Sequence, residues 1–576
     1  MSSSYQVTGT NKAAPFTLKV HRGDGMALLA MNWRNGKPPK DFVGFAIECK
    51  EPGAGKKFEA VANRIQFDGP PSATTKDRVS SLQAPFQTFR WVHFPRNAEL
   101  NGAFTYRITP VFMDAQDRIT PGLAQEAAIE LARETYAGKL NVSFTRGFIA
   151  SQAFVDYYCK TNAELKTLLP AKADAGLSFT PTHPKAQQAM EWMGFEARSA
   201  VLELLDEAIA DKQAQVRVVA YDLNQPELLT RLEQLGGRLR IIIDDDGKHG
   251  EPHSPESKAA KRLRATAGAA NVLRQHMGKL QHNKTIVVQG PKVKAALCGS
   301  TNLTWRGIYV QNNHAVIMRG ASVAKLFMQA FDDYWASGGK PGTFGKTASA
   351  GWNDLGLAGI DARITFSPRT ASKAVLQGIA DDIGNAKGSL FYSLAFLYQT
   401  PGAVVKAIDK LQDANKVFSF GVSDHEVGVL RITKPSGLVR VVYPAALGKG
   451  LPAPFKPELT GGSGNRMHHK FVVIDFDTPS ARVYFGSFNF SGAADTSNGE
   501  NLVLVKDRRI ATSFMIEAVR IYDHYNFRVK SAADKKKRGK KDRFTLQRPP
   551  RKAGEKPWWD KFYTDPVRVR DRQTFS

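Results

Sequence analysis

The stretch MHHKFVVID, residues 467–475, places a histidine and a lysine two positions apart in front of an apolar run that an aspartate closes. Side chains alternate between the two faces of a strand, so His468 and Lys470 share one face. The apolar residues from Phe471 to Ile474 are the part that packs into a core. The stretch therefore predicts a buried strand with two polar side chains at its N-terminal end.

The same pattern occurs a second time in QHNKTIVVQ, residues 281–289, where His282 and Lys284 precede the apolar run. Two further motifs follow each copy in the same order. The first copy is followed by GSTN at 299–302 and QNNHAVIM at 311–318, and the second by GSFN at 486–489 and NGENLVLV at 498–505. Motifs that recur in register indicate an internal duplication.

Helices and apolar strands alternate before each copy. ARSAVLELLDEAIADKQ, VRVVAYDL, PELLTRLEQLGG and RLRIIIDDD precede the first, and SKAVLQGIADDIGNAKG, SLFYSLAFLY, PGAVVKAIDKLQDAN and VFSFGVSD precede the second in the same order. Helical periodicity followed by β-branched runs is typical of an α/β fold whose strands are buried on both faces.

The N-terminal and C-terminal parts of the chain have other sequence patterns. Up to about residue 140, short aromatic-rich strands between Gly, Pro and Asn turns predict a β-sandwich of immunoglobulin or fibronectin type, without a catalytic cluster. We expect Trp558 and Trp559 to dock the C-terminal tail on the body, and the KKKRGKK run before them to be a solvated or polyanion-contacting segment. The predicted organisation is a β-sandwich at 1–140, a linker at 141–185, a first α/β repeat at 186–345, a second at 346–530, and a basic, aromatic tail at 531–576.

Composition limits the partners. Among 576 residues, Lys and Arg number 80 against 54 Asp and Glu, and the net charge of +26 favours an anionic partner such as nucleic acid or an acidic membrane surface. Cys49, Cys159 and Cys298 are widely spaced, which indicates neither a disulfide framework nor a zinc site. The N-terminus lacks a signal-peptide pattern and no transmembrane run is present, so we expect a cytoplasmic protein, with signal-independent export left open.

These motifs resemble those of the phospholipase D superfamily, in which HxKxxxxD is followed by GSxN and then by Asn-x-Glu. The resemblance covers about residues 190–525, and the second copy is closest to the nuclease and mitochondrial cardiolipin hydrolase branch. It implies a duplicated α/β/α sandwich whose two repeats form one active site, so that a monomer suffices.

The resemblance also implies metal-independent hydrolysis or transfer at a phosphodiester through a phosphohistidine, without a cofactor. Histidine can act as nucleophile and as proton carrier near neutral pH, and lysines can hold the phosphate oxygens. The implied catalytic residues are His282, Lys284, His468, Lys470, Asp475 and Glu500, and the implied phosphate-binding residues are Ser300, Asn302, Ser487 and Asn489.

The two copies differ at two positions. The first has Gln289 where the second has Asp475, and Asn313 where the second has Glu500. A carboxylate stabilises an imidazolium better than an amide does, so the sequence-based hypothesis is that His468, backed by Glu500, is the nucleophile. His282 is then the general acid and base. The departures leave an alternative open, a non-catalytic protein that binds polyanions in a degenerate site.

The substrate stays open between a nucleic-acid backbone and an anionic phospholipid, the latter with peripheral membrane contact. The acidic stretch IIIDDDGKHGEPH is interpreted as a solvated loop rather than a metal site. His276 and His314 are interpreted as structural histidines, and the basic residues of 256–275 as an exposed helix face.

Overall fold

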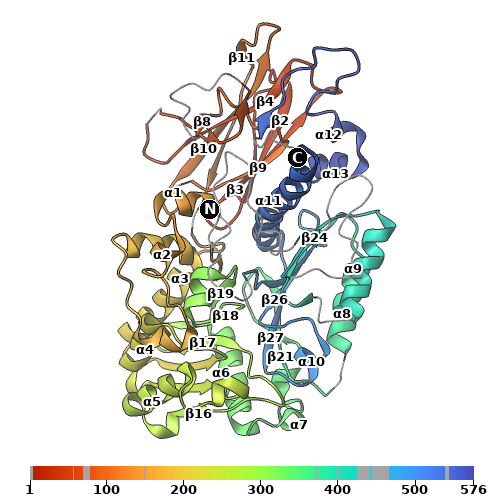
Figure 1. The fold of residues 1–576 in the computed structure, drawn as a ribbon. Coiled ribbons are helices and arrows are strands. Elements are labelled where there is room, and N and C mark those ends of the chain that lie inside the picture. Colours follow the sequence, from red (N-terminus) through yellow and green to blue (C-terminus); the bar gives the residue numbers. More distant parts are fainter. Residues whose placement is uncertain are drawn as a thin grey trace.

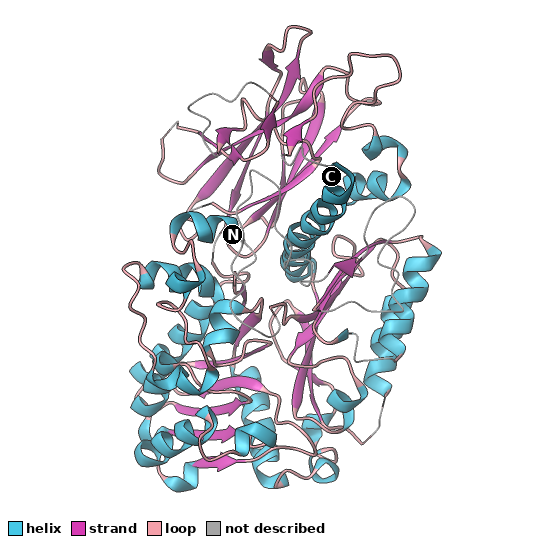
Figure 2. Cartoon of the chain, viewed as in Figure 1, coloured by secondary structure: helices cyan, strands magenta, loops and turns pink. Residues whose placement is uncertain are grey.

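The computed structural model describes residues 4–576 except 56, 69–77, 96, 132, 148–150, 371–372, 398–401, 425–440, 443–465 and 539–543, and only the backbone of 151–153, 162, 173–174, 441–442 and 527–538. A β-rich N-terminal part lies at one end of the molecule, and two α/β halves lie side by side below it (Figure 1). The mixture of helices and several separate sheets is plain in Figure 2.

The N-terminal part consists of two antiparallel sheets that share one core. The first contains β1 (Gln6–Thr8), β2 (Phe16–Arg22), β3 (Ala27–Trp33) and β9 (Arg90–His93), and the second β4 (Phe42–Lys50), β5 (Glu59–Ala60), β10 (Ala103–Met113), β11 (Ile119–Pro121) and β12 (Gln125–Glu130). Phe16, Phe45 and Tyr106, from both sheets, are buried together because alternate residues of each strand face inward. That this β-rich part is a sandwich of immunoglobulin or fibronectin type remains a prediction.

The first repeat is built on a seven-stranded sheet of order β13-β19-β18-β17-β14-β15-β16. Its strands are β13 (Leu140–Phe144), β14 (Gln215–Ala220), β15 (Leu239–Ile243), β16 (Val272–Arg274), β17 (Lys284–Gln289), β18 (Lys294–Gly299) and β19 (His314–Arg319). Its helices are α1 (Ser151–Tyr157), α2 (Asn162–Leu165), α3 (Ala186–Ala210), α4 (Pro226–Gln234), α5 (Pro255–Ala267), α6 (Ala321–Ser337) and α7 (Pro341–Phe344).

The second repeat has the same strand order, β21-β27-β26-β25-β22-β23-β24, with β20 added at one edge. Its strands are β20 (Asn353–Asp354), β21 (Asp361–Ser367), β22 (Ser389–Leu394), β23 (Phe418–Ser423), β24 (Val441–Val442), β25 (Lys470–Ile474), β26 (Arg482–Gly486) and β27 (Glu500–Lys506). Its helices are α8 (Ala374–Gly384), α9 (Ala403–Ala414), α10 (Gly492–Thr496) and α11 (Arg508–Arg538). Parallel and antiparallel pairs also correspond, which supports the predicted duplication.

Two segments outside the predicted repeats are structural parts of the body. Within 141–185, predicted as a linker, β13 pairs with the edge strand β19, and Phe154 and Leu168 join the core of the first repeat. The reason is that β19 needs a partner on its outer side, as β27 has in β21.

The C-terminal tail folds back on the β-rich N-terminal part. β28 (Thr545–Leu546) pairs with β7 (Gln66–Phe67), and α12 (Lys561–Thr564) and α13 (Pro566–Thr574) follow. Trp558 and Trp559 donate their indole N–H groups to the carbonyls of Phe42 and Pro39, which confirms the predicted docking. In the KKKRGKK run the side chains of 535–538 and all of 539–541 lie outside the described residues.

One hydrophobic core joins the two halves. α6 and α11 lie between them, and Phe327 of α6 packs edge-on against Phe366 of β21, in the other repeat. α11 covers the second sheet and also contacts β13 of the first. No described helix is long and apolar enough to cross a membrane.

Candidate active site

The two HxK pairs lie at the start of the central strands β17 and β25, one in each sheet. His282, Lys284, His468 and Lys470 are each at most 4% exposed. Each lysine turns back toward its own histidine, with Nζ of Lys470 3.0 Å from the carbonyl oxygen of His468 and 3.1 Å from its Nε2. The pairs are anchored as predicted because the rest of each strand is buried in the core.

A pseudo-twofold relationship brings the repeats together at this point. Gln281 forms an isolated bridge with Gly499, and Met467 forms the equivalent bridge with Asn312. In both cases the residue before an HxK histidine pairs with the residue before the acid or amide of the opposite repeat. The partners of the two histidines are therefore exchanged between the repeats.

Nδ1 of His282 lies 2.7 Å from Oε2 of Glu500, and Nδ1 of His468 lies 2.9 Å from Oδ1 of Asn313. The sequence-based hypothesis that Glu500 backs His468 is therefore wrong. The physical reason is the exchange across the pseudo-twofold, which adjacency in the sequence does not reveal.

Hydrogen bonds fix which nitrogen of each imidazole is protonated. Asn313 donates its Nδ2–H to the carbonyl of Gly307, so its Oδ1 faces His468 and can only accept. His468 must therefore carry the proton on Nδ1 when it is neutral. The Glu500 carboxylate imposes the same tautomer on His282, so both rings leave Nε2 for chemistry.

Burial disfavours charge throughout this cluster. It lowers the pKa of both His282 and His468 well below the usual range, and the neighbouring lysines lower both further. Burial also lowers the pKa of Lys284 to about 8 and that of Lys470 well below its usual value. Burial raises the pKa of Glu500 to about 7. The ammonium groups of Lys284 and Lys470 repel each other in this buried cluster. A bound anion would offset that repulsion, so the cluster is suited to receive one.

The predicted phosphate-binding residues divide into two groups. Ser300 and Ser487 are fully buried and support the histidine partners: the Ser300 hydroxyl donates to Oδ1 of Asn313, and Ser487 hydrogen-bonds the Glu500 carboxylate. Asn302 and Asn489 differ, because among the described residues nothing hydrogen-bonds their side-chain oxygens. Of these four residues, the two serines support the histidine partners. The two asparagines each keep a side-chain oxygen that no described residue hydrogen-bonds.

Asp475 lies outside the site. It follows the last residue of β25, at the opposite end of the strand from Lys470, and accepts hydrogen bonds from the backbone N–H groups of Lys387, Gly388 and Ser389 at 2.7–3.1 Å. Its place among the predicted catalytic residues is thus not supported by the geometry. Its counterpart Gln289 is exposed at the end of β17.

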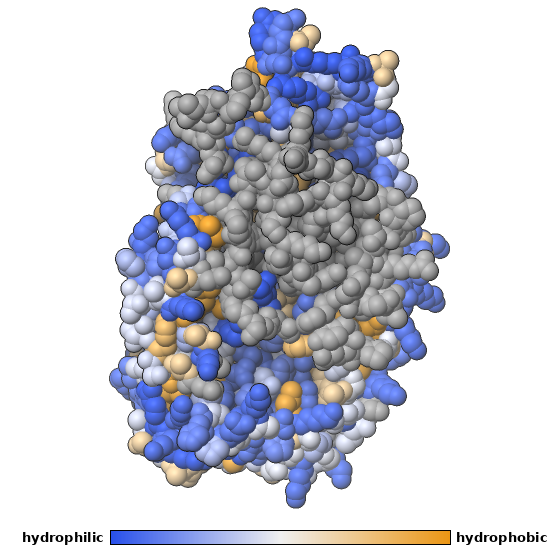
Figure 3. Space-filling model, viewed as in Figure 1, coloured by the Kyte–Doolittle hydropathy of each residue, from blue (hydrophilic) through white to orange (hydrophobic). Residues whose placement is uncertain are grey.

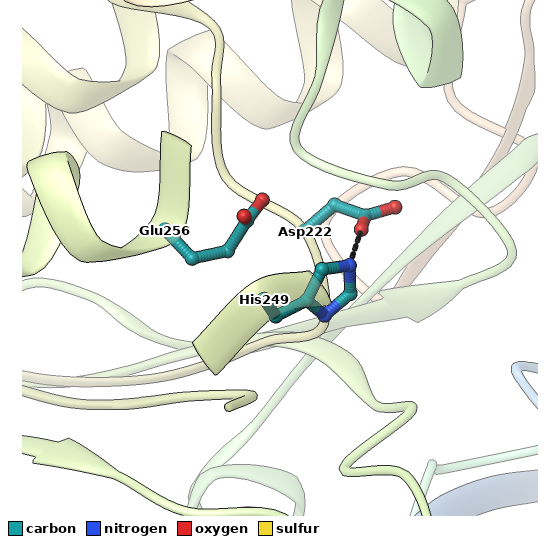
Figure 4. A group of neighbouring side chains, drawn as sticks. All are labelled: Asp222, His249 and Glu256. Carbon is teal, nitrogen blue, oxygen red and sulfur yellow. Dashed lines mark ion pairs between the residues drawn. The ribbon is translucent and has the colours of Figure 1, made fainter. Parts of the chain in front are cut away.

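Sequence reasoning missed a polar layer behind His282. The ring centroid of Tyr221 lies 4.7 Å from those of both His282 and His249. Asp222 lies 2.9 Å from Nε2 of His249 (Figure 4). It also accepts a hydrogen bond from Asn302 of the GSTN motif. The signal for Asp222 was its place two residues after the strand β14, at the end where α/β folds collect functional side chains.

The polar layer is an ion-pair network. Asp222, His249 and Glu256 each have an atom that could bind a metal ion, and these atoms lie within 4.8 Å of one another (Figure 4). Among the described residues, this is the one group of three or more His, Cys, Asp or Glu side chains with that spacing. Burial opposes the charge of His249, but the carboxylates of Asp222, at 2.9 Å, and Asp244, at 3.8 Å, raise its pKa to about 10. The predicted loop residue Asp245 pairs instead with His276.

Comparisons with known proteins agree on one family. The family described as "Cardiolipin synthase, PLD-like domain" matches residues 204–335 and 449–521. A phospholipase D of Rickettsia felis is 42% identical over 48 residues, which are 8% of this chain and 22% of that protein, and the Rickettsia prowazekii enzyme matches to the same extent. The match thus spans about a fifth of the length of these curated relatives.

Solved structures give similarities at low sequence identity. A phosphatidylserine synthase of Haemophilus influenzae is 12% identical, with a TM-score of 0.41, over 57% of this chain and 85% of that one. The phospholipase D family member Nuc of Salmonella typhimurium is 22% identical, with a TM-score of 0.18, over 30% of this chain and 95% of that one.

Proposed function

Because the chain belongs to the phospholipase D superfamily, we propose that it is a phosphodiesterase that works without a metal, through a phosphohistidine on His282. The observation that carries this proposal is the crossed pair of contacts, His282 with Glu500 and His468 with Asn313. Two imidazoles of fixed tautomer and two ammonium groups around one buried point are what in-line displacement at a phosphodiester requires.

In the first step, the Nε2 lone pair of His282 attacks phosphorus and the bond to the leaving oxygen breaks. The phosphorylated ring becomes cationic, and the carboxylate of Glu500 at 2.7 Å offsets that charge. His468 gives its Nε2 proton to the leaving oxygen. The anionic substrate itself favours the protonated form of His468, because it neutralises Lys284 and Lys470.

In the second step, His468 takes a proton from water or an acceptor alcohol, and the resulting oxygen attacks phosphorus. The P–N bond breaks and His282 returns to its neutral form. Water yields a phosphomonoester and an alcohol yields a new phosphodiester. Asn313 suits His468 for this role because an amide orients the ring without holding a permanent positive charge on it.

The substrate class we propose is an anionic phosphodiester, of a nucleic acid or of a phospholipid. A net charge of +26 attracts either one. Hydrophilic residues dominate the described part of the face drawn in Figure 3. The departures at Gln289 and Asn313 leave both HxK pairs intact, and Asn313 has a positioning role of its own, which disfavours a binding-only protein.

Turnover in EDTA tests the proposal. Wild-type protein would be offered bis(p-nitrophenyl) phosphate, single-stranded DNA, RNA and cardiolipin vesicles, beside His282→Asn and His468→Asn. His253→Asn is the matched control, because His253 is exposed and lies outside the cluster. We expect both cluster variants to lose turnover of one substrate class while the control retains it. Absence of turnover in the wild type would reject the enzyme.

A further inference from the structure

Behind each catalytic histidine lies a second pair of side chains, and the two pairs are related by the pseudo-twofold. In one half, Asn501 donates from Nδ2 to Oδ1 of Asn283 at 2.8 Å. In the other, Nδ1 of His314 lies 3.3 Å from Nδ1 of His469. Asn283 and His469 are the middle residues of the two HxK motifs. A pair of amides in one repeat is thus a pair of imidazoles in the other.

One member of each pair hydrogen-bonds a serine hydroxyl. Asn501 donates to the hydroxyl oxygen of Ser487 from both its backbone N–H and Nδ2, at 3.0 and 3.2 Å. His314 contacts Ser300 in the same way, from its backbone N–H at 3.1 Å and from Nδ1 at 3.2 Å. A serine whose oxygen already accepts must send its own proton elsewhere, and Ser300 sends it to Asn313.

A chain of hydrogen bonds makes Nδ1 of His314 a donor. Glu517 of α11 accepts from Nε2 of His469 at 2.9 Å and is itself paired with Arg520. With its proton on Nε2, a neutral His469 presents a bare Nδ1, which accepts from Nδ1–H of His314. All four of these side chains are at most 6% exposed, so water does not compete.

We propose that His314 and His469 are a positioning pair for the proposed reaction: by keeping Nδ1–H of His314 turned to Ser300, they hold Asn313 and His468 in register. This inference rests on the proposed function for its kinetic part only. Were His314 to lose its Nδ1 proton, it would accept from the Ser300 hydroxyl instead. Two oxygens 2.8 Å apart, on Ser300 and Asn313, would then face each other without a proton and repel.

The imidazole pair, unlike the amide pair, can take up a proton. The charged groups that face it are Lys470 from β25 and Glu517 and Arg520 from α11. Four aromatic rings also pack against the pair: Phe144 of β13, Phe471 of β25, Phe485 of β26 and Phe514 of α11. A proton on His469 reverses the Nδ1–Nδ1 hydrogen bond and makes His314 an acceptor. Acid therefore loosens the hydrogen bonds behind His468, whereas the amide pair behind His282 takes up no proton.

Two variants of the full-length chain test the proposal. His469→Leu removes the acceptor while keeping bulk in the core. The double variant His314→Asn/His469→Asn recreates the amide pair of the other repeat. For each, we would record the thermal midpoint, kcat and KM from pH 5 to 8, and the His468 tautomer by ¹⁵N NMR of histidine-labelled protein, with His468→Asn as the assignment control.

We expect His469→Leu to lose about tenfold in kcat at an unchanged KM, with His468 divided between two tautomers. We expect the double variant to recover kcat and to keep the Nδ1–H tautomer of His468 at a lower pH than the wild type does. A folded His469→Leu variant with wild-type kcat and tautomer would overturn the proposal. If that variant fails to fold, a double variant whose His468 loses the Nδ1–H tautomer at the same pH as the wild type overturns it instead.

The NMR measurement needs no turnover. A wild-type protein that is inactive on every substrate but shows the Nδ1–H tautomer, lost in His469→Leu, therefore refutes the proposed function and supports the positioning pair. The opposite result, activity without a change in tautomer, refutes the pair alone.

Discussion

Glu500 and His282 belong to different repeats, yet Oε2 of the first lies 2.7 Å from Nδ1 of the second, and both side chains are at most 4% exposed. Among the described residues, neither HxK histidine has a carboxylate partner within its own repeat. The duplication therefore builds a site that only the two halves together complete.

Glu500→Gln should lower kcat by about 10²- to 10⁴-fold, because the cationic phosphohistidine then lacks its counter-charge. KM should change little, since Lys284 and Lys470 still face the substrate. Asn498→Ala is the matched control, because Asn498 donates to the other carboxylate oxygen and does not touch His282. Equal losses of kcat in both variants would contradict the role given to Glu500.

Catalytic efficiency should fall at both low and high pH. The pKa of Glu500 is raised to about 7, so acid below that value neutralises the carboxylate and kcat falls. The pKa of Lys284 is lowered to about 8, so KM rises above that value as the ammonium is lost. Acid affects stability in the opposite direction to kcat. Because the pKa of Glu500 is raised on folding, this group stabilises the folded state most below pH 4.5, and the stabilisation is lost as the pH rises to about 7. Initial rates and urea midpoints across pH 5–9 measure both trends.

Sulfate binding should be accompanied by proton uptake near neutral pH. Both histidines are neutral in the free cluster because burial and the lysines lower their pKa, and a bound dianion reverses that balance. Titration calorimetry in buffers of different ionisation enthalpy measures the uptake, and sulfate contributes no protons of its own. The uptake should diminish in His468→Asn. Binding without any buffer dependence would show that the histidines do not sense the anion.

Asp475→Ala should destabilise the fold and spare the chemistry. The carboxylate accepts from backbone N–H groups at Gly388 and Ser389 at 2.7 and 3.0 Å, and orphaning buried donors costs about 1–3 kcal/mol each. Asp475→Asn is the control, since its amide oxygen can still accept and φ at this position is +54°. A loss of kcat without a change in the urea midpoint would restore Asp475 to the catalytic residues.

The sequence predicted the duplicated α/β body and both HxK pairs because strand periodicity and repeated motifs are local signals. It could not predict which acid faces which histidine, because the exchange of Glu500 and Asn313 depends on how two sheets meet. It also interpreted His314 as a lone structural residue, since its partner His469 is 155 positions away. Asp222 was missed for the same reason, because its link to Asn302 spans separate strands.

The identity of the phosphorylated histidine tests the central claim most directly. Bis(p-nitrophenyl) phosphate has a leaving group that needs no general acid, so His468→Asn should still form the intermediate and fail to hydrolyse it. After an alkaline quench, peptide mass mapping of His468→Asn should place a p-nitrophenyl phosphoryl group on the peptide that carries His282, together with a stoichiometric burst of p-nitrophenolate. That group on His468 in the His282→Asn variant, with none on His282 in His468→Asn, would contradict the account.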